Sequence, residues 1–369
     1  MPVTWLTEPN SRCNYETKQQ SAFEKRLIHN QPLMRKLIFI PLLFLFLHSF
    51  AQDPNFSQFF ASPLTLNPAL TGKFNGDMRL AMNYRNQWPV INNAFRTGTA
   101  SADFGILGKS IPEFDQFGVG VMGMYDVNGS GVMKNSYITG SVAYHKGLDE
   151  NGYHQIGVGF SGTYAQRRLD ISKLDFADEL TTLGFTGNTA ELFASNGFLN
   201  INYADLNAGV IYNGATNDYN NFYIGASMYH INRPKVSFQG ANFVLNPRYT
   251  IHGGGYFPIA DATTLFVSAN QQFQSGASET ILGAAVGFTV NSDFDNATDV
   301  YAGAFFRVGD AIIPYAGLEF GSYRLGLSYD VNVSRLAAAS RRRGGMEISL
   351  IWIKKHTDPN KKKLNCPKF

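Results

Sequence analysis

The sequence predicts an all-β protein, a single antiparallel transmembrane β-barrel of the outer-membrane type with about 14 strands. Three observations lead there: alternating apolar segments, loops of unequal length and few charged residues. The alternation is clearest in residues 322–332, where every second side chain is large and apolar: Tyr323, Leu325, Leu327, Tyr329 and Val331. Because successive side chains of a strand point to opposite faces, one face of this segment is apolar and aromatic at its ends, as in strands that cross an outer membrane.

The same pattern recurs along the chain. Alternation is clean in 153–166, 280–290 and 346–355, whereas 116–126 and 299–308 have apolar residues on both faces. The average length of the candidates suits a tilted membrane strand of about 9–11 residues. The strand candidates cover roughly 78–88, 95–104, 116–126, 134–146, 153–166, 203–213, 221–230, 248–257, 263–273, 280–290, 299–308, 311–320, 322–332 and 346–355.

Loop lengths are an independent indication of the same fold. With an even number of strands and a periplasmic N-terminus, the connections after odd-numbered strands face outward. The longest connections follow the fifth, seventh and thirteenth candidates, at about 167–202, 231–247 and 333–345. Long outer loops and short periplasmic turns are typical of bacterial barrels. A pair of soluble β-sandwiches or a propeller is the alternative architecture.

Composition agrees with a barrel. Charged residues make up only 16% of the chain, below the usual quarter of a soluble domain. The formal net charge is +3, but the first 51 residues hold six basic and three acidic side chains, so the remainder is balanced. This balance gives no indication of nucleic-acid binding. Beyond the N-terminal region, no apolar run is long enough to predict a transmembrane helix.

The N-terminal region predicts export to the outer membrane. A basic start at residues 34–36 is followed by an apolar run over 37–50 and small residues near Ala51, the pattern of a cleaved signal peptide. Residues 34–51 are therefore the predicted signal peptide, and residues 1–33 a misassigned upstream start. An N-terminal transmembrane anchor is the alternative.

Three regions of the mature chain follow. Residues 52–77 are rich in aromatic residues and broken by three prolines, which excludes a central strand. We expect this irregular segment to pack in or under the mouth of the barrel. The barrel then covers 78–355, and the basic tail 356–369 hangs in the periplasm. Because Cys13 is removed with the leader, Cys366 has no partner for an internal disulfide.

The sequence predicts no enzyme, no cofactor and no metal site. No cluster of His, Asp and Glu has the spacing of metal ligands. Ser268, Asn270 and His252, on neighbouring strands, are the nearest approach to a hydrolytic triad. Such triads are defined by geometry, and Ser and Asn are common in any polar lumen. An outer-membrane hydrolase is thus the least favoured class of function.

Charged residues on the strands are expected to face the lumen, because a charge facing lipid is costly. Ion pairs that brace the wall are the favoured interpretation, and a lined pore is the alternative. The residues concerned are Arg79, Arg85, Arg307, Glu319, Arg324 and Asp330. The basic loop Arg335 to Arg343 is expected outside, either merely solvated or bound to anionic polysaccharide or a secreted client.

Several stretches resemble a known family in their order along the chain. They are Gln52-Asp53-Pro54 to Asn67-Pro68-Ala69, Tyr84-Arg85-Asn86-Gln87-Trp88-Pro89, Leu174-Asp175-Phe176, Arg233-Pro234, Pro247-Arg248-Tyr249-Thr250 and Cys366-Pro367-Lys368-Phe369. Together they resemble the PorP/SprF family of type IX secretion membrane proteins. The resemblance implies an outer-membrane subunit of a Bacteroidetes machine that exports and anchors surface proteins, including gliding adhesins.

The resemblance also implies partners. These are a secreted surface protein with a C-terminal sorting domain, periplasmic and lipoprotein components of the machinery, and outer-membrane lipid. The residues expected to bind partners are Tyr84, Arg85, Asn86, Gln87, Trp88, Pro89, Cys366, Pro367, Lys368 and Phe369. Trp88 and Pro89 are equally compatible with an anchor in the aromatic belt. The alternative function is a passive porin or hydrophobic-solute transporter, which requires an open lumen.

Overall fold

A computed structural model describes most of the chain between residues 53 and 355. The described residues are 53–92, 94–106, 110–187, 189–190, 197–217, 219–238, 242–291 and 297–355. The predicted signal peptide and the tail 356–369 lie outside them. Within the described residues, no helix is long and apolar enough to cross a membrane.

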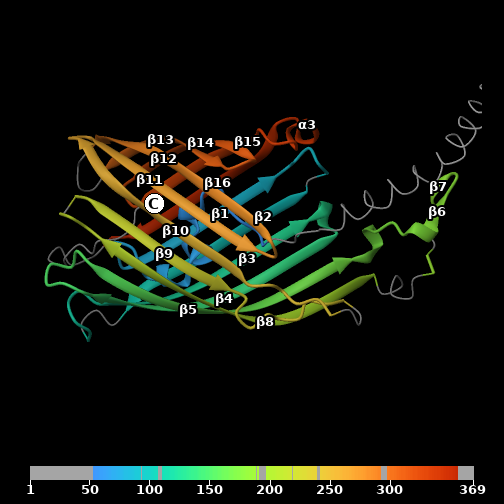
Figure 1. Cartoon of the computed structure of the whole chain (residues 1–369), viewed down its shortest axis with the longest axis horizontal. Coiled ribbons are helices and arrows are strands. Elements are labelled where there is room, and N and C mark those ends of the chain that lie inside the picture. Colours follow the sequence, from blue (N-terminus) through green and yellow to red (C-terminus); the bar gives the residue numbers. More distant parts are fainter. Residues whose placement is uncertain are drawn as a thin grey trace, which may run out of the picture. The chain divides into compact units, whose positions relative to one another are not determined.

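Fourteen antiparallel strands form a closed barrel in which β1 pairs with β16 (Figure 1). This confirms the predicted fold class and strand number. The barrel strands are β1 (Met78–Gln87), β2 (Phe95–Ile106), β3 (Gln116–Asn128), β4 (Met133–Gly147), β5 (Gln155–Asp170), β8 (Phe198–Gly214), β9 (Asn221–Tyr229), β10 (Arg248–Ala260), β11 (Thr263–Gln274), β12 (Ala277–Asn291), β13 (Thr298–Arg307), β14 (Ala311–Phe320), β15 (Tyr323–Asn332) and β16 (Arg343–Lys354).

The connections contain only short elements. The longest, between β5 and β8, carries a separate two-stranded sheet. These elements are η3 (Gly129–Gly131), η4 (Ile171–Lys173), η5 (Ala177–Glu179), β6 (Leu180–Thr181), β7 (Gly184–Phe185) and α3 (Ala337–Ser340). The three longest connections, 171–197, 230–247 and 333–342, follow the fifth, seventh and thirteenth barrel strands, as the sequence predicts. Because antiparallel strands alternate in direction, all three lie at one end, which we call the outer end.

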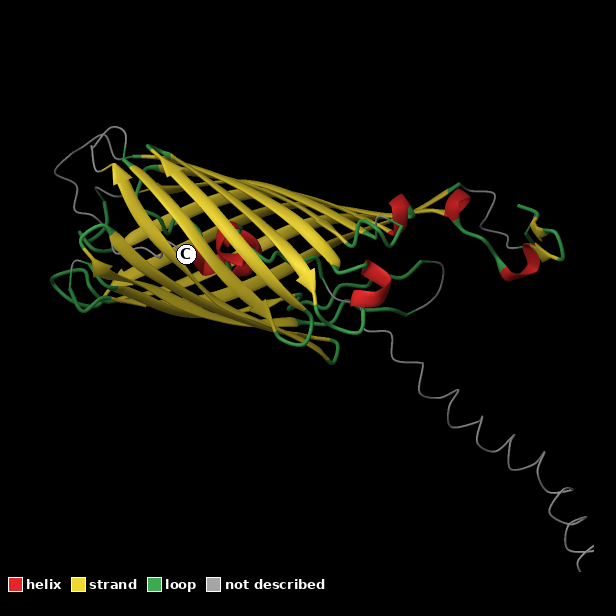
Figure 2. Ribbon diagram, turned by 90° about the horizontal axis from the view of Figure 1, so that it is seen from above, coloured by secondary structure: helices red, strands yellow, loops and turns green. Residues whose placement is uncertain are grey.

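The barrel is apolar outside and polar inside. In β15 the predicted apolar face, with Leu325, Leu327 and Tyr329, is exposed, whereas Ser328 and Asp330 are buried. Every backbone group of a membrane-spanning strand must find its partner within the protein, and closure of the barrel provides those partners without a free edge. The strands are inclined to the barrel axis (Figure 2), as closure requires.

The buried inner face is covered by the chain itself. Residues 53–77, which we call the luminal segment, lie inside the barrel, and their short helical turns are visible between the strands of the wall (Figure 2). The turns are η1 (Phe59–Ala61), α2 (Pro63–Leu66) and η2 (Pro68–Leu70). Proline opens α2 and η2, where its missing N–H costs nothing, and the Asn67 side chain accepts from the amide of Ala69.

Aromatic residues of the luminal segment pack on one side of the lumen. The ring centroids of Phe60 lie 5.4 Å from Phe305 and 5.6 Å from Tyr315, on β13 and β14. Tyr301 is also buried in this cluster. The inward-facing Phe305 of β13 is therefore apolar because it contacts the luminal segment. This contact explains why residues 299–308 lack a clean alternation.

Glycines in the wall make room for the luminal segment on the opposite side, for its backbone at Gly118 and Gly159 and for the Asn67 side chain at Gly209. A Cβ atom on Gly118, Gly159 or Gly209 would overlap Thr71, Ala69 or Asn67, respectively. These glycines lie on β3, β5 and β8. Their lack of a side chain allows backbone-to-wall contact that any larger residue would prevent.

A substitution on β5 tests whether the wall glycines hold the luminal segment. In Gly159→Val, we expect the barrel to fold while residues 66–72 lose contact with the wall, because the new side chain occupies their space. Hydrogen exchange of the Ala69 and Thr71 amides should accelerate at least about tenfold, equal to roughly 1.4 kcal/mol. Heat-modifiable migration on gels checks the barrel.

The matched control is Gly162→Val on the same strand. Gly162 is exposed, and a Cβ atom there meets nothing within 4 Å. This variant should leave exchange in the luminal segment unchanged. Equal exchange in both variants would contradict the role of Gly159.

Candidate functional site in the lumen and at the outer rim

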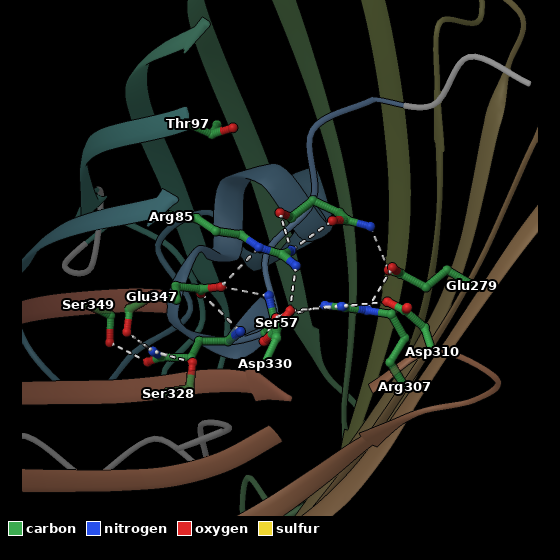
Figure 3. Close-up of polar contacts among 12 residues, drawn as sticks. Ser57, Arg85, Thr97, Glu279, Arg307, Asp310, Ser328, Asp330, Glu347 and Ser349 are labelled. Atoms are coloured by element: carbon green, nitrogen blue, oxygen red, sulfur yellow. Dashed lines mark hydrogen bonds and ion pairs between the residues drawn. The ribbon is translucent and has the colours of Figure 1, made fainter. Parts of the chain in front are cut away.

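A cluster of buried charges joins the luminal segment to the wall in the outer half of the lumen (Figure 3). Asp330 on β15 is 2% exposed and pairs with Arg85 of β1 at 2.7 Å and Arg307 of β13 at 2.8 Å. The hydroxyl of Ser57, in the luminal segment, donates to Asp330 Oδ1 over 2.8 Å. Two wall arginines and one luminal hydroxyl thus satisfy a single carboxylate.

Glu347 of β16 accepts hydrogen bonds from the backbone of the luminal segment. The amides of Ser57 and Gln58 donate to its two carboxylate oxygens over 2.7 and 3.0 Å. The Gln58 side chain bonds Ser328 and the Glu347 carbonyl at 3.0 and 3.1 Å. A charge-assisted bond to a backbone amide is among the stronger hydrogen bonds of proteins. Glu347 therefore fixes the position of this backbone turn.

Asn55 extends the cluster toward the outer end. Arg85 Nη1 donates to both the carbonyl and the side-chain oxygen of Asn55 over 2.8 Å. The Asn55 amide donates in turn to Glu279 of β12 over 2.7 Å, and Glu279 pairs with Arg307 at 3.0 Å. The hydrogen-bonded network therefore crosses the lumen, from β1 through the luminal segment to β12 and β13.

A second cluster holds the first described residue, Asp53. Its carboxylate lies 2.6 Å from His230 Nε2 and 3.5 Å from Arg248 Nη1. Asp205 of β8 contacts the other ring nitrogen of His230 at 2.9 Å. The Arg248 guanidinium stacks on the Tyr229 ring, 4.2 Å from its centroid. We call these residues the outer clasp, because His230 and Arg248 flank an outer connection.

The outer clasp changes the acidity of its members. Burial alone would lower the pKa of His230, which lies just beyond β9, but the attraction of Asp53 and the contacts with both carboxylates outweigh burial and raise it to about 9. Burial raises the pKa of Asp53, whereas the attraction of His230 and Arg248 lowers it by more, to well below its ordinary value. The clasp is thus an ion pair at neutral pH.

A small, mainly apolar space opens beside the outer clasp. Its walls combine the apolar side chains Met122, Met124, Tyr137 and Tyr229 with the polar His230. Flexible Met side chains adapt to different apolar groups.

The inner half of the lumen is held by polar contacts. Arg79 pairs with Asp103 at 2.7 Å and donates to the Leu70 carbonyl over 3.0 Å, while the Gly72 amide donates to Asp103 over 2.8 Å. His145 Nε2 lies 2.7 Å from the Ala69 carbonyl. The luminal segment is thereby fixed from Asp53 at the outer end to Gly72.

The three residues considered as a hydrolytic triad do not form one. His252 and Asn270 lie opposite each other on β10 and β11, but His252 Nε2 accepts from the Asn67 amide over 3.0 Å. Within the described residues no hydrogen bond joins Ser268 to His252. Nor does this part of the chain contain a group of three His, Cys, Asp or Glu residues that could hold a metal ion.

The six residues Tyr84 to Pro89 are divided between three environments. Arg85 points into the lumen and joins the Asp330 cluster, whereas Tyr84 is 45% exposed on the outer surface. Trp88 lies at the outer rim, where its amide donates to the Gly344 carbonyl over 2.8 Å and its ring meets Phe95 edge-on. The positive φ of 54° at Trp88 ends β1. The residues Cys366 to Phe369 lie outside the described part of the chain.

The structure also places the charges that the sequence assigns to the lumen. Arg324 and Glu319 pair at 2.7 Å across β14 and β15, as a brace within the wall would. Arg85 and Arg307 also form ion pairs within the wall, with Asp330, and in addition they bind the luminal segment. Sequence reasoning missed Ser57, whose partners lie far along the chain.

Comparison with known proteins identifies the family. The family model for the type IX secretion system membrane protein PorP/SprF matches residues 48–352. The chain belongs to the PorP/SprF family. Among curated proteins, none matches the chain. The stretches that carry the resemblance meet in the lumen: Asn55 of the leading segment binds Arg85, and Asp53 pairs with Arg248.

Several solved barrels share the fold at low identity. The Pseudomonas putida toluene transporter TodX has a TM-score of 0.47 and 10% identity, over 79% of this chain and 92% of TodX. The CymD monoaromatic hydrocarbon channel has a TM-score of 0.44 and 9% identity, over 81% and 94%. A Pseudomonas aeruginosa FadL homologue has a TM-score of 0.42 and 11% identity, over 78% and 92%. The family match and the closed antiparallel barrel together make the chain an outer-membrane barrel.

Removal of the Arg85 charge tests the Asp330 cluster of this PorP/SprF barrel. Arg85→Gln leaves Glu347 without its cation and removes one of the two arginines at Asp330. Breaking a buried ion pair from one side costs about 3–5 kcal/mol. The free energy of unfolding, measured by denaturant titration in detergent, should fall by that order.

A suitable control is Arg341→Gln, because Arg341 is exposed in an outer connection. This change should alter the free energy of unfolding by less than about 0.5 kcal/mol. The cluster would have no structural role if the two variants were equally stable.

The outer clasp predicts a pH dependence of stability. Because the folded pKa of His230, about 9, is raised above its ordinary value of 6.5, the stabilisation is complete below pH 6.5 and is lost as pH rises through 9. The difference in melting temperature between the protein and its His230→Gln variant should therefore shrink between pH 6.5 and 10. In an Asp53→Asn background this pH dependence should be much weaker, and an unchanged dependence there would rule out Asp53 as the cause.

Proposed function

We propose that this PorP/SprF barrel is a non-enzymatic docking subunit of the type IX secretion apparatus. Its outer end binds a secreted surface protein with a C-terminal sorting domain. Its inner turns and the tail 356–369 bind periplasmic and lipoprotein components of the machinery. Together these contacts help to export or anchor the surface protein, including adhesins used in gliding.

The observation that carries this proposal is the luminal segment. A diffusion channel needs an open lumen, whereas here the lumen is crossed by residues held at several levels by buried hydrogen bonds and ion pairs. Displacing them would expose Asp330 and Glu347 without their luminal partners, at a cost of several kcal/mol. The surfaces left for partners are therefore the two ends of the barrel.

The outer end has features that suit a protein partner. A small apolar space opens beside the outer clasp, and Trp88 lies at the rim with a half-buried ring. Tryptophan is enriched among residues that dominate binding energies. The long connections 171–197 and 230–247 add adaptable surface around this space. We assign client contact to Trp88 and Pro89 on this basis.

The alternative function is a passive porin or hydrophobic-solute transporter. It predicts steady conductance or solute uptake by the purified protein in planar bilayers. The docking function predicts conductance close to that of a barrel-free bilayer. Channel activity of the wild-type chain without partners would favour the alternative.

Affinity purification tests the docking function directly. The tagged protein, extracted from membranes, should carry a large secreted protein and periplasmic lipoproteins that mass spectrometry identifies. Deletion of 356–369 should remove the periplasmic components and retain the secreted protein. A Trp88→Ala variant should lose the secreted protein at least about tenfold, as expected for loss of a central aromatic contact.

Heat-modifiable migration on gels must be kept in both variants, because the proposal separates binding from folding. Tyr323→Ala, an exposed aromatic residue at the inner end of β15, is the matched control for Trp88. Recovery of a lone barrel from wild-type membranes would contradict the docking function.

A further inference from the structure

A row of basic residues faces outward near the outer end of β2 to β5. The register places Arg96 beside Val127, Val127 beside Lys134, and Lys134 beside Arg168 on consecutive strands. Arg96 and Arg168 are exposed, and Lys134 is partly exposed. We call Arg96, Lys134 and Arg168 the basic row.

The neighbouring row of residues fixes the direction of these side chains. Thr97, Asp126, Asn135 and Arg167 are joined by hydrogen bonds of 2.8 to 3.1 Å, and the first three are buried in the lumen. Because successive side chains of a strand alternate between faces, the next residue toward the outer end faces outward on each strand. The basic row therefore belongs to the outward face of the barrel, where Val127 between Arg96 and Lys134 is covered by neighbouring residues.

Exposed tyrosines lie on the same outward face, further from the outer end than the basic row. They are Tyr84, Tyr125 and Tyr164, which are 45%, 49% and 56% exposed. Tyrosine girdles mark the boundary between the apolar core and the headgroups. The turns 88–94 and 129–132 follow immediately beyond the row. Its charges thus reach the headgroups of the outer leaflet.

The charges of the row are only partly balanced by the protein. Lys134 and Arg168 lie directly opposite each other, an arrangement of like charges that destabilises a strand pair. In the part of the chain that the structure describes, no ion pair joins the row to a carboxylate. Asp170, at the end of β5, pairs with Lys173 at 3.6 Å, and its carboxylate also interacts electrostatically with Lys134. The Arg168 guanidinium stacks 3.6 Å from the centroid of the Phe198 ring, which orients it.

We propose that the basic row binds the phosphate groups of lipid A, the phosphorylated glycolipid anchor of lipopolysaccharide in the outer leaflet. A phosphate between Lys134 and Arg168 would relieve their repulsion, and guanidinium groups bind phosphate in a bidentate manner. The acyl chains of the same lipid would cover the apolar surface below. This inference rests on the outer-membrane location and on the outer end facing outward, and is independent of client binding.

The experiment measures binding of purified diphosphoryl lipid A to the full-length barrel in zwitterionic nanodiscs. Each basic side chain near a charged lipid surface contributes about fivefold in affinity. The variant with both Lys134→Gln and Arg168→Gln should therefore bind about thirtyfold more weakly. Lys354→Gln is the matched control, because Lys354 is an exposed basic residue at the inner end of β16, and its affinity should match the wild type.

Three outcomes would overturn the proposal. The first is equal lipid A affinity of the double variant and the wild type. The second is equal wild-type affinity for lipid A and for its dephosphorylated form or phosphatidylglycerol. The third is displacement by millimolar inorganic phosphate, which would indicate a free-anion site. If the double variant fails to fold, the Arg96→Gln variant replaces it, with heat-modifiable migration as the check of folding. This variant should bind lipid A about fivefold more weakly. Unchanged affinity of Arg96→Gln would also overturn the proposal.

Discussion

The buried carboxylate of Asp330 links the wall of the barrel to the luminal segment, and the arrangement of the interior depends on this link. A barrel that turns its apolar face to lipid must place its charges inside, where each one needs a partner. Asp330 finds two arginines in the wall and the hydroxyl of Ser57 in the luminal segment. The wall and the luminal segment therefore each supply hydrogen-bond or ion-pair partners to the same buried carboxylate.

Two kinds of contact divide the lumen around this cluster. On the side of β13 and β14, aromatic residues of η1 pack on Phe305 and Tyr315, which supplies apolar burial. On the side of β3 to β8, glycines such as Gly159 let the backbone of η2 approach the wall closely. Both sides of the lumen are therefore complementary in shape to the luminal segment. A general pore would need neither the aromatic contacts nor these glycines.

The strands could be predicted from sequence because alternation is local and the membrane enforces it on each strand. The site could not, because its contacts join residues such as Ser57 and Asp330 that lie 273 positions apart. The luminal segment has no periodicity, so its prolines excluded a strand without revealing its partners. Arg324 and Glu319 were recognisable as a brace because they face each other across one short turn. The weak alternation of β13 was a sign of interior packing that only the structure explains.

The position of the luminal segment limits how this PorP/SprF barrel can work. The segment runs from the outer clasp at Asp53 to the start of β1 at the inner end, and the Asp330 cluster fixes it between them. A sliding movement would break several buried charge-assisted bonds at once, each costly to leave unpaired. Opening would therefore require a partner that binds the displaced state more tightly by several kcal/mol. Without such a partner, the buried contacts keep the luminal segment in place. The surfaces that another molecule can reach are then the two ends of the barrel and its outward face.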